Sequence, residues 1–323
     1  MELTEKGDAS VSDFNPPAAA NGVTHSTADD THSTANAPSN TPQRWPDLTP
    51  EHPLAQFIAM LPGVLEEADY SEVYGVALSC SASDASFHTK LVLQKFLRAN
   101  SDDIPQARTQ LLETLKWRKS YQPLLAMDEV HSGTRFRGLG YVMRLSDVPD
   151  SVNAEDVATF NIYGAVKDTK RTFGDIDAFL RWRIALMELG LSRLHLSTAT
   201  RPIPDFGHGA DPYQGIQIHD YLNVTFLFQP AETKAATKRT IEIFTKYYPE
   251  TLSRKYFVNV PRVMQWMFAV VRPMLARETV KKFNVLSYGD QLVGELGTSV
   301  PEVYGGKGGS LESVGEGLKM KEG

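Results

Sequence analysis

Hydrophobic and polar positions follow two patterns along this 323-residue chain, and the change falls near Gly138. Before that point, apolar residues recur at three- and four-residue spacings, as in the stripe of Leu111, Leu112, Leu115 and Trp117, which is typical of helices. After it, strand-like runs alternate with helical stretches. This order predicts an α/β protein in which a helical N-terminal subdomain precedes a largely parallel sheet with crossover helices.

The two patterns also predict individual elements. Strands are expected at 140–143, 160–166, 215–228, 256–260 and 283–286, and helices at 175–191, 230–248 and 261–275. The first part of the chain is expected to be helical over 53–125, where Ser101-Asp102-Asp103 is a polar break that can cap the second of two helices.

Composition predicts where the folded part begins and ends. Residues 1–50 are rich in Ser, Thr, Asn, Ala and Pro, and such a segment cannot bury enough apolar surface to offset chain entropy, so we expect it to be disordered. The Gly/Lys/Glu-rich end, 307–323, is expected to be flexible. The predicted domains between them are a helical subdomain at 51–130 and a sheet domain at 131–306.

Charge and cysteine content exclude several classes of function. Residues 1–50 hold seven acids and two bases, hence −5 of the net −6, which leaves about −1 for the other 273 residues. A body so close to neutral offers no strong field for nucleic acid, which is therefore not an expected partner. Cys80 is the only cysteine, so an intramolecular disulfide and a cysteine-based zinc site are excluded.

Targeting signals are also missing from the sequence. The N-terminus carries no apolar run of the secretory type, and we expect a cytoplasmic protein. The longest apolar-rich segment, 263–275, is too short to span a bilayer, so any membrane contact is expected to be peripheral.

The segment 214–224 has the most informative alternation, because alternate side chains of a strand share one face. One face then holds an apolar set with one acid: Ile216, Ile218, Asp220, Leu222 and Val224. The other face holds a polar set: Gln217, His219, Tyr221 and Asn223. Two neighbouring side chains of the polar set, a histidine and a tyrosine, suit one shared ligand or metal. An ordinary strand with a polar solvent face gives the same pattern.

Motifs of the common enzyme classes are missing. The sequence has no G-x-G-x-x-G, no Walker loop, no G-x-S-x-G and no H-E-x-x-H. A binding or carrier role is therefore favoured over catalysis.

Six blocks of sequence between about 85 and 306 resemble, in order, the CRAL-TRIO lipid-binding family, which includes fungal phosphatidylinositol transfer proteins. These blocks are 91–99 (LVLQKFLRA), 115–119 (LKWRK), 247–250 (YYPE), 256–261 (YFVNVP), 279–286 (TVKKFNVL) and 301–306 (PEVYGG). The resemblance implies a helical subdomain and a mixed sheet that floors a large apolar pocket. It also implies that the helix at 261–275 is a movable lid, and the Trp and Met content of this helix predicts transient contact with a membrane. A fully buried helix is the alternative.

Four further blocks resemble most closely the non-classical fungal subclass (the fifth yeast homologue class), which is associated with haem b in the pocket. They are 181–184 (RWRI), 187–188 (ME), 218–221 (IHDY) and 254–261 (RKYFVNVP). The resemblance implies that Tyr221 ligates ferric iron, and a phenolate suits that ion. His219 is then a second ligand or the group that orients the phenolate.

The same resemblance assigns three further haem contacts. Arg183 and Lys255 are expected to pair with the propionates, although surface ion pairing is the ordinary role of such residues. Tyr163 is expected to contact the haem, with a place in the core as the alternative.

For the lipid, the resemblance implies a headgroup site at Glu250, Thr279 and Lys282. Asn100 stands where the family motif has an arginine, so headgroup binding is expected to be weakened or altered. A simple helix-end carboxylate is the alternative for Glu250.

We therefore expect a non-catalytic phosphatidylinositol transfer protein that also binds ferric haem b, with a role in phosphoinositide homeostasis or in the response to haem and oxidants. It is expected to contact the endoplasmic reticulum or microsomal membrane peripherally. The first alternative is a lipid carrier without haem. A haem enzyme of peroxidase or catalase type ranks lower, because no distal acid–base pair is recognisable. The sequence leaves the oligomeric state open.

Overall fold

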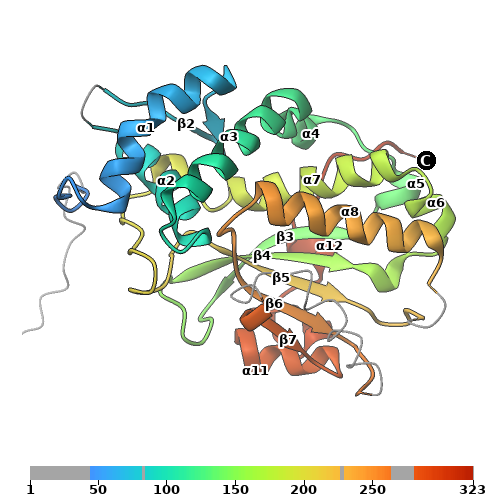
Figure 1. Cartoon of the computed structure of the whole chain (residues 1–323). Coiled ribbons are helices and arrows are strands. Elements are labelled where there is room, and N and C mark those ends of the chain that lie inside the picture. The colour runs from blue at the N-terminus through green and yellow to red at the C-terminus, as the bar shows by residue number, and fades with distance from the viewer. Residues whose placement is uncertain (1–43, 82–83, 226–228, 263–279, 323) are drawn as a thin grey trace, which may run out of the picture. The chain divides into compact units, whose positions relative to one another are not determined.

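Helices dominate the first part of the folded chain (Figure 1). The structure, a computed structural model, describes residues 44–81, 84–225, 229–262 and 280–322. Its early elements are α1 (Pro53–Ala68), α2 (Phe87–Ala99), α3 (Ile104–Tyr121) and α4 (Pro123–Asp128), with a short hairpin of β1 (Glu72–Val73) and β2 (Val76–Ala77). The expected cap is present, because the Asp103 carboxylate accepts a hydrogen bond from the Gln106 amide.

The folded part begins earlier than composition suggests. Trp45 lies within the segment expected to be disordered, yet it is buried, and its ring meets Phe87 edge-on with centroids 5.5 Å apart. One tryptophan can bury enough surface to fix a short segment that is otherwise polar. The remainder of that predicted tail, up to residue 43, lies outside the described residues.

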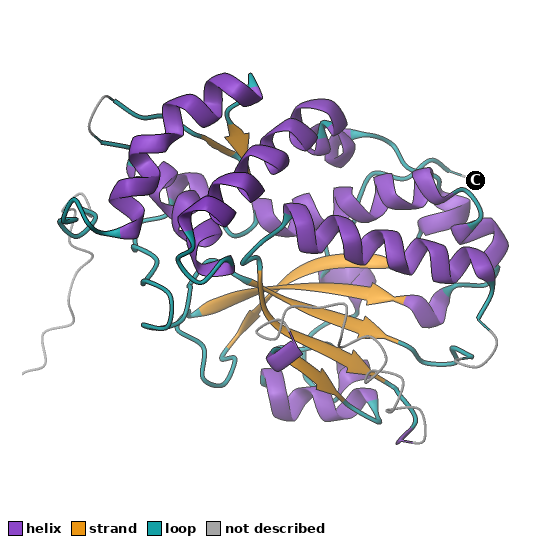
Figure 2. Ribbon diagram, in the orientation of Figure 1, coloured by secondary structure: helices purple, strands orange, loops and turns teal. Residues whose placement is uncertain are grey.

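A five-stranded mixed sheet forms the second part (Figure 2). Its strands, in spatial as well as chain order, are β3 (Gly140–Ser146), β4 (Glu155–Ile162), β5 (Gly215–Asp220), β6 (Leu252–Val258) and β7 (Phe283–Val285). The β3–β4 pair is antiparallel and the other three pairs are parallel. The predicted α/β class with crossover helices is confirmed.

The two faces of the sheet are covered by different elements (Figure 1). One face lies against α7 (Ile176–Ser192) and α8 (Ala231–Tyr247), with α6 (Thr169–Phe173) beside them. On the other face, Ile216, Ile218 and Val258 belong to a separate apolar cluster with α11 (Leu292–Leu296). Both faces are therefore interior, as expected for parallel strands.

The remaining described elements are short. The helices are α5 (Gly133–Phe136) and α12 (Leu311–Val314), and the 3-10 turns are η1 (Tyr163–Ala165), η2 (Leu196–Thr198), η5 (Gly289–Gln291) and η6 (Glu302–Tyr304). Within the described ranges, the chain has no helix of sufficient length and apolar character to cross a membrane.

Strand β5 stops earlier than predicted, at Asp220 rather than at 228. The Asp220 carboxylate accepts a hydrogen bond from the Leu222 amide at 2.8 Å, and Asn223 adopts a φ of 65°, which turns the chain. Leu222 is consequently half exposed and does not join the apolar face with Ile216 and Ile218. The end of the predicted strand, 226–228, lies outside the described residues.

Strand β4 also ends early, and η1 replaces the predicted strand over 163–165. Gly164 permits this, because a Cβ at that position would lie 2.1 Å from the Leu222 carbonyl oxygen. The close approach of the two backbones brings the residues that follow β4 and β5 side by side.

The C-terminal end is held in place, contrary to the flexibility expected for 307–323. Glu316 exchanges two backbone hydrogen bonds with Val142 of β3, at 2.7 and 2.8 Å. His131 exchanges another two with Lys319 and Lys321. Glycine and lysine content suggested mobility, but backbone pairing does not depend on side-chain type.

Candidate ligand-binding site

The polar face of β5 is enclosed by protein. Gln217 and His219 are 8% and 6% exposed, and the Gln217 amide lies 3.9 Å from the sulfur of Met187 on α7. The interpretation of this face as an ordinary solvent face is therefore wrong. Buried polar groups on this scale need either partners or a function.

Three of the predicted site residues meet at the ends of β4 and β5. The Tyr163 ring lies 5.4 Å from the rings of both His219 and Tyr221, measured between centroids. Phe257 of β6 adds an aromatic wall, at 5.5 Å from His219 and 6.3 Å from Tyr221. Tyr221 lies just beyond the end of β5, so its position depends on the following turn and not on the strand alone.

Both candidate iron ligands are uncharged in the ligand-free protein. Burial, then Lys255 and Arg183, hold the pKa of His219 well below its ordinary value. Burial likewise raises the pKa of the Tyr221 hydroxyl. A neutral imidazole and a protonated phenol are therefore the resting forms, and only the phenol must lose a proton before it can bind a metal.

Arg183 of α7 is buried and under-partnered. Its side chain is 1% exposed, and neither Nε nor Nη1 has a hydrogen-bond partner. Its guanidinium stacks on the Phe244 ring of α8 at 4.7 Å. The expectation of an ordinary surface ion pair is wrong for this residue, because the described part of the chain gives it no carboxylate.

Lys255 of β6 is the second cation of the site. Its ammonium lies 5.3 Å from the Phe257 ring centroid and 5.5 Å from that of Phe283, and no carboxylate pairs with it among the described residues. Burial, with a contribution from Arg183, lowers the pKa of Lys255 to about 7. One buried and one partly buried cation without an acid among the described residues favour an anionic ligand.

We expect this arrangement to reduce stability in the absence of a ligand. Between pH 7 and 10, the unfolded chain keeps a proton on Lys255 that the folded chain has lost. The free energy of unfolding therefore rises with pH, by up to about 1.4 kcal/mol per pH unit. Lys255→Met should remove this slope and stabilise the protein most at pH 7. Urea unfolding at pH 7, 8 and 9 measures the effect, with the exposed Lys307→Met as control. Parallel profiles for wild type and Lys255→Met would contradict the assignment.

The predicted lipid headgroup residues form a second polar region at the opposite end of the strands. Glu250 lies 3.6 Å from the Lys282 ammonium and 3.8 Å from the Arg98 guanidinium, and it accepts a 2.6 Å hydrogen bond from Gln214. The structure thus brings Glu250 and Lys282 together, and Glu250 is not a simple helix-end carboxylate. Thr279 lies outside the described residues.

Sequence reasoning missed the buried ion pair beneath this region. Lys95 donates to the Asp211 carboxylate at 2.6 Å and also to the carbonyls of Tyr213 and Glu250. Lys95 is part of the LVLQKFLRA block, where its position on the buried stripe of α2 was the available signal. The Lys95–Asp211 pair therefore holds the backbone at Glu250 in place.

Asn100 contributes nothing to this second region. Its amide donates to the Phe96 carbonyl and to Gln110 of α3, which directs it toward the helical part. Arg98 and Lys282 are the cations that pair with the Glu250 carboxylate, and altered headgroup binding stays a prediction.

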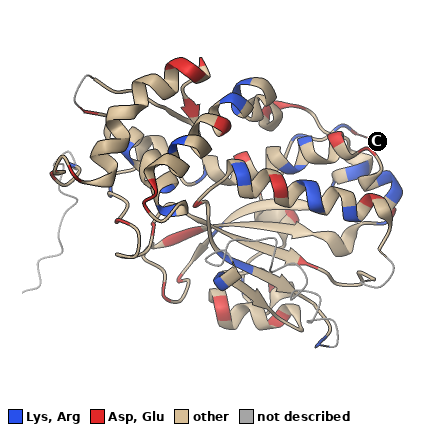
Figure 3. Cartoon of the chain, viewed as in Figure 1, with Lys and Arg blue, Asp and Glu red and all other residues tan. Residues whose placement is uncertain are grey.

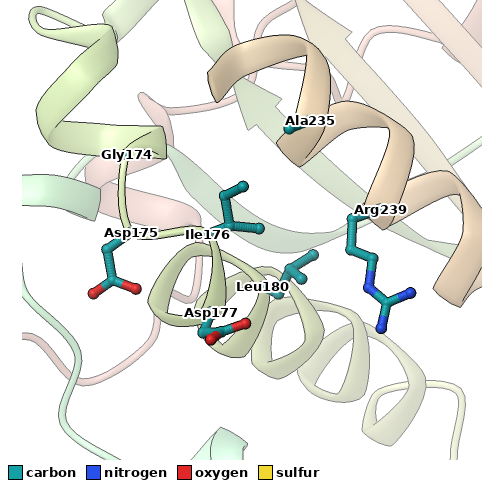
Figure 4. Close-up of a pocket in the computed structure, with 7 residues that line it drawn as sticks. All are labelled: Gly174, Asp175, Ile176, Asp177, Leu180, Ala235 and Arg239. Carbon is teal, nitrogen blue, oxygen red and sulfur yellow. The ribbon is translucent and has the colours of Figure 1, made fainter. Parts of the chain in front are cut away.

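One open hollow of the described surface lies elsewhere (Figure 4). It has a volume of about 570 Å³ and is lined by Gly174, Asp175, Ile176, Asp177, Leu180, Ala235 and Arg239, from the start of α7 and from α8. None of these residues belongs to the predicted site. No cluster of three His, Cys, Asp or Glu residues suited to a metal occurs among the described residues either.

A mixed sheet walled by two helices, with uncompensated cations inside, defines a protein that encloses an amphipathic or anionic ligand. The CRAL/TRIO domain matches residues 166–306. The phosphatidylinositol transfer protein SFH5 of Phaeosphaeria nodorum is 55% identical over 277 residues, which cover 86% of this chain and 83% of that protein. Its counterpart in Cryptococcus neoformans (strain B-3501A) is 46% identical over 295 residues, or 90% and 98% of the two chains.

A solved structure has the same fold as this chain. The crystal structure of Sfh5 superposes with a TM-score of 0.72 at 29% identity, covering 84% of this chain and 93% of that one. The chain belongs to the CRAL/TRIO family and, within it, to the fungal SFH5 phosphatidylinositol transfer proteins. Its relatives are named as transfer proteins, and the expectation that the chain is not an enzyme is confirmed on that ground.

Proposed function

We propose that the protein carries phosphatidylinositol between membranes and also holds ferric haem b, with Tyr221 as the iron ligand. The observation that carries the haem assignment is a pair of cations, the buried Arg183 and the partly buried Lys255, that have no carboxylate partner among the described residues. They lie beside two uncharged candidate ligands, His219 and Tyr221. The relatives' names support the lipid assignment.

The residues of the site fit a haem by their chemistry. A bound haem supplies a ferric centre and two propionate anions. Arg183 and Lys255 offer charge-assisted hydrogen bonds to carboxylates, and the unpartnered Nε and Nη1 of Arg183 are free to donate them. Tyr221 offers a phenolate once it is deprotonated, and tyrosine is a known axial ligand of haem iron.

His219 suits a supporting role beside Tyr221. Its Nε2 lies 3.4 Å from the Gln217 side-chain oxygen, so Gln217 can fix the orientation of the imidazole. Phe257 and Tyr163 lie beside the pair, 5.5 and 5.4 Å from the His219 ring, and would provide an apolar surround for a bound haem.

Titration of the ligand-free protein with haemin tests this part of the proposal. We expect stoichiometric binding with a shifted Soret band. An unshifted spectrum would leave the first alternative, a lipid carrier without haem. Rapid turnover of peroxide by the loaded protein would instead favour the haem enzyme.

The lipid part rests on Glu250, Lys282 and Arg98, with Thr279 proposed as a further contact from the resemblance. The phosphate of a bound inositol phosphate would replace Glu250 as the partner of Lys282 and Arg98. A dianionic phosphate binds two cations more strongly than does one carboxylate that also accepts a hydrogen bond from Gln214. We further propose a cytoplasmic protein that visits the endoplasmic reticulum membrane. The helix at 261–275, predicted to be the lid, lies outside the described residues.

Lys282→Ala should slow phosphatidylinositol transfer. Loss of one charge-assisted hydrogen bond corresponds to about 1.5–3 kcal/mol, or roughly ten- to one-hundred-fold. Transfer of labelled lipid between vesicles measures the rate, and the exposed Lys307→Ala is the matched control. Equal rates for Lys282→Ala and the unaltered chain would rule out Lys282 as a headgroup contact.

A further inference from the structure

Cations gather where α6 meets the N-terminal half of α8. Figure 3 shows Lys and Arg side by side at this end of the molecule, and the two helices contact each other. The exposed members, which we name the α6–α8 cationic surface, are Lys167, Lys170, Arg171, Lys234, Lys238 and Arg239. None of them belongs to the ligand site described above.

Acidic groups compensate this surface only in part. Glu242 pairs with Arg239 at 3.3 Å and with Lys238 at 4.0 Å. Within the described ranges, four cations have no carboxylate partner: Lys167, Lys170, Arg171 and Lys234.

The local charge is opposite in sign to that of the whole chain. Segments 165–173 and 231–240 together hold six cations and two acids, Asp168 and Glu232, a balance of +4 in a chain whose net charge is −6. The Asp168 side chain is also occupied, because it caps α6 by accepting the Arg171 amide. Such a local excess creates a positive potential that attracts anionic partners.

An exposed leucine lies near one member of this surface, Lys167. Leu222 is 50% exposed, and its backbone lies against that of Gly164, three residues before Lys167. An exposed large apolar side chain on the same molecule as a cationic surface is typical of proteins that rest on a bilayer, where the apolar group enters the acyl boundary and the cations meet lipid phosphates.

We propose that the α6–α8 cationic surface docks the protein on a bilayer that contains anionic lipids, with Leu222 inserted. A nucleic acid would also attract the cations, but its phosphate backbone would make no use of the exposed leucine, and the body of the chain, at about −1, offers no strong field for a long polyanion. Two residues of the ligand site lie on the elements beside this surface, Tyr163 on η1 and Phe244 on α8. Docking at this surface would therefore bring that side of the ligand site close to the membrane. The inference extends the proposed lipid transfer.

Vesicle co-sedimentation tests the proposal without relying on transfer. We expect binding to phosphatidylcholine vesicles with about one fifth phosphatidylserine, little binding to phosphatidylcholine alone, and release by salt. Each cation at such a surface contributes roughly five-fold in partitioning, so Lys170→Gln/Lys234→Gln should bind roughly twenty-five-fold more weakly. Both side chains are exposed and unpaired, so the fold should persist, which circular dichroism checks.

The matched control is Lys116→Gln/Lys307→Gln, which removes two exposed charges from α3 and from the loop after η6. It should bind within two-fold of the wild type, while Leu222→Ser should bind several-fold more weakly at raised salt. Equal loss in the control, equal binding to neutral vesicles, or tighter binding of a duplex DNA at the same phosphate concentration would each overturn the proposal. Intact vesicle binding together with absent lipid transfer would overturn only the transfer function.

Discussion

Tyr221→Phe should abolish tight haem binding while the fold survives. The substitution removes the phenolic oxygen proposed to bind the iron and keeps the ring that packs on Tyr163 and Phe257. Loss of a group that merely supports a ligand lowers metal affinity by roughly 10- to 100-fold, so loss of the ligand itself should exceed about 100-fold. Haemin titration followed at the Soret band measures the change.

Two further variants separate ligation from packing. Tyr163→Phe removes a hydroxyl from the same aromatic cluster and should leave the Soret position unchanged. His219→Ala should lower affinity within the range of a supporting group if it only orients Tyr221. Unchanged haem occupancy and spectrum in Tyr221→Phe would refute the assignment, whatever the other two variants do.

Arg118→Leu should be strongly destabilising. Arg118 is fully buried on α3 and donates to Glu188 of α7 at 2.7 Å and to Glu72 of β1 at 2.8 Å. Leucine in its place would leave the buried Glu188 with Tyr248 as a hydrogen-bond donor and no cation. Loss of one partner of a buried pair costs about 3–5 kcal/mol, which chemical denaturation would record.

Two comparisons show whether burial is the cause. Arg108 is on the same helix as Arg118 and forms an exposed pair with Glu67 of α1. Arg108→Leu should lower the free energy of unfolding by about 1 kcal/mol or less. Arg118→Leu/Glu188→Leu removes both charges and should recover part of the loss, because an apolar pair can replace a buried ion pair. A loss below about 1 kcal/mol for Arg118→Leu would contradict this account.

Much of the fold could be predicted from sequence because the hydrophobic periods persist over whole elements. Helices α7 and α8 begin and end within about one residue of the predictions. The ends of β4 and β5 could not be predicted in this way. They depend on a carboxylate turn at Asp220 and on the close approach of Gly164 to Leu222, which is a contact between segments distant in sequence.

The candidate site, like the fold, has features that local sequence patterns predict and features that they do not. Alternation predicts that His219 and Tyr221 share a face, and the resemblance adds Tyr163, Arg183 and Lys255. That no described carboxylate pairs with Arg183 or Lys255 is a property of how distant segments pack, and no local pattern contains it. The pairing of Lys95 with Asp211 likewise could not be predicted from the sequence, because 115 residues lie between them along the chain.

The backbone pairing of Glu316 with Val142 bears on how the molecule behaves at high concentration. Strand β3 is at one margin of the sheet, and the last residues of the chain occupy its outward hydrogen-bonding groups at this point. The other margin, β7, has only three residues. An uncovered or long margin is a template for pairing between molecules. At Val142, therefore, the C-terminal residues take the hydrogen-bonding groups that a strand from a second copy would otherwise use.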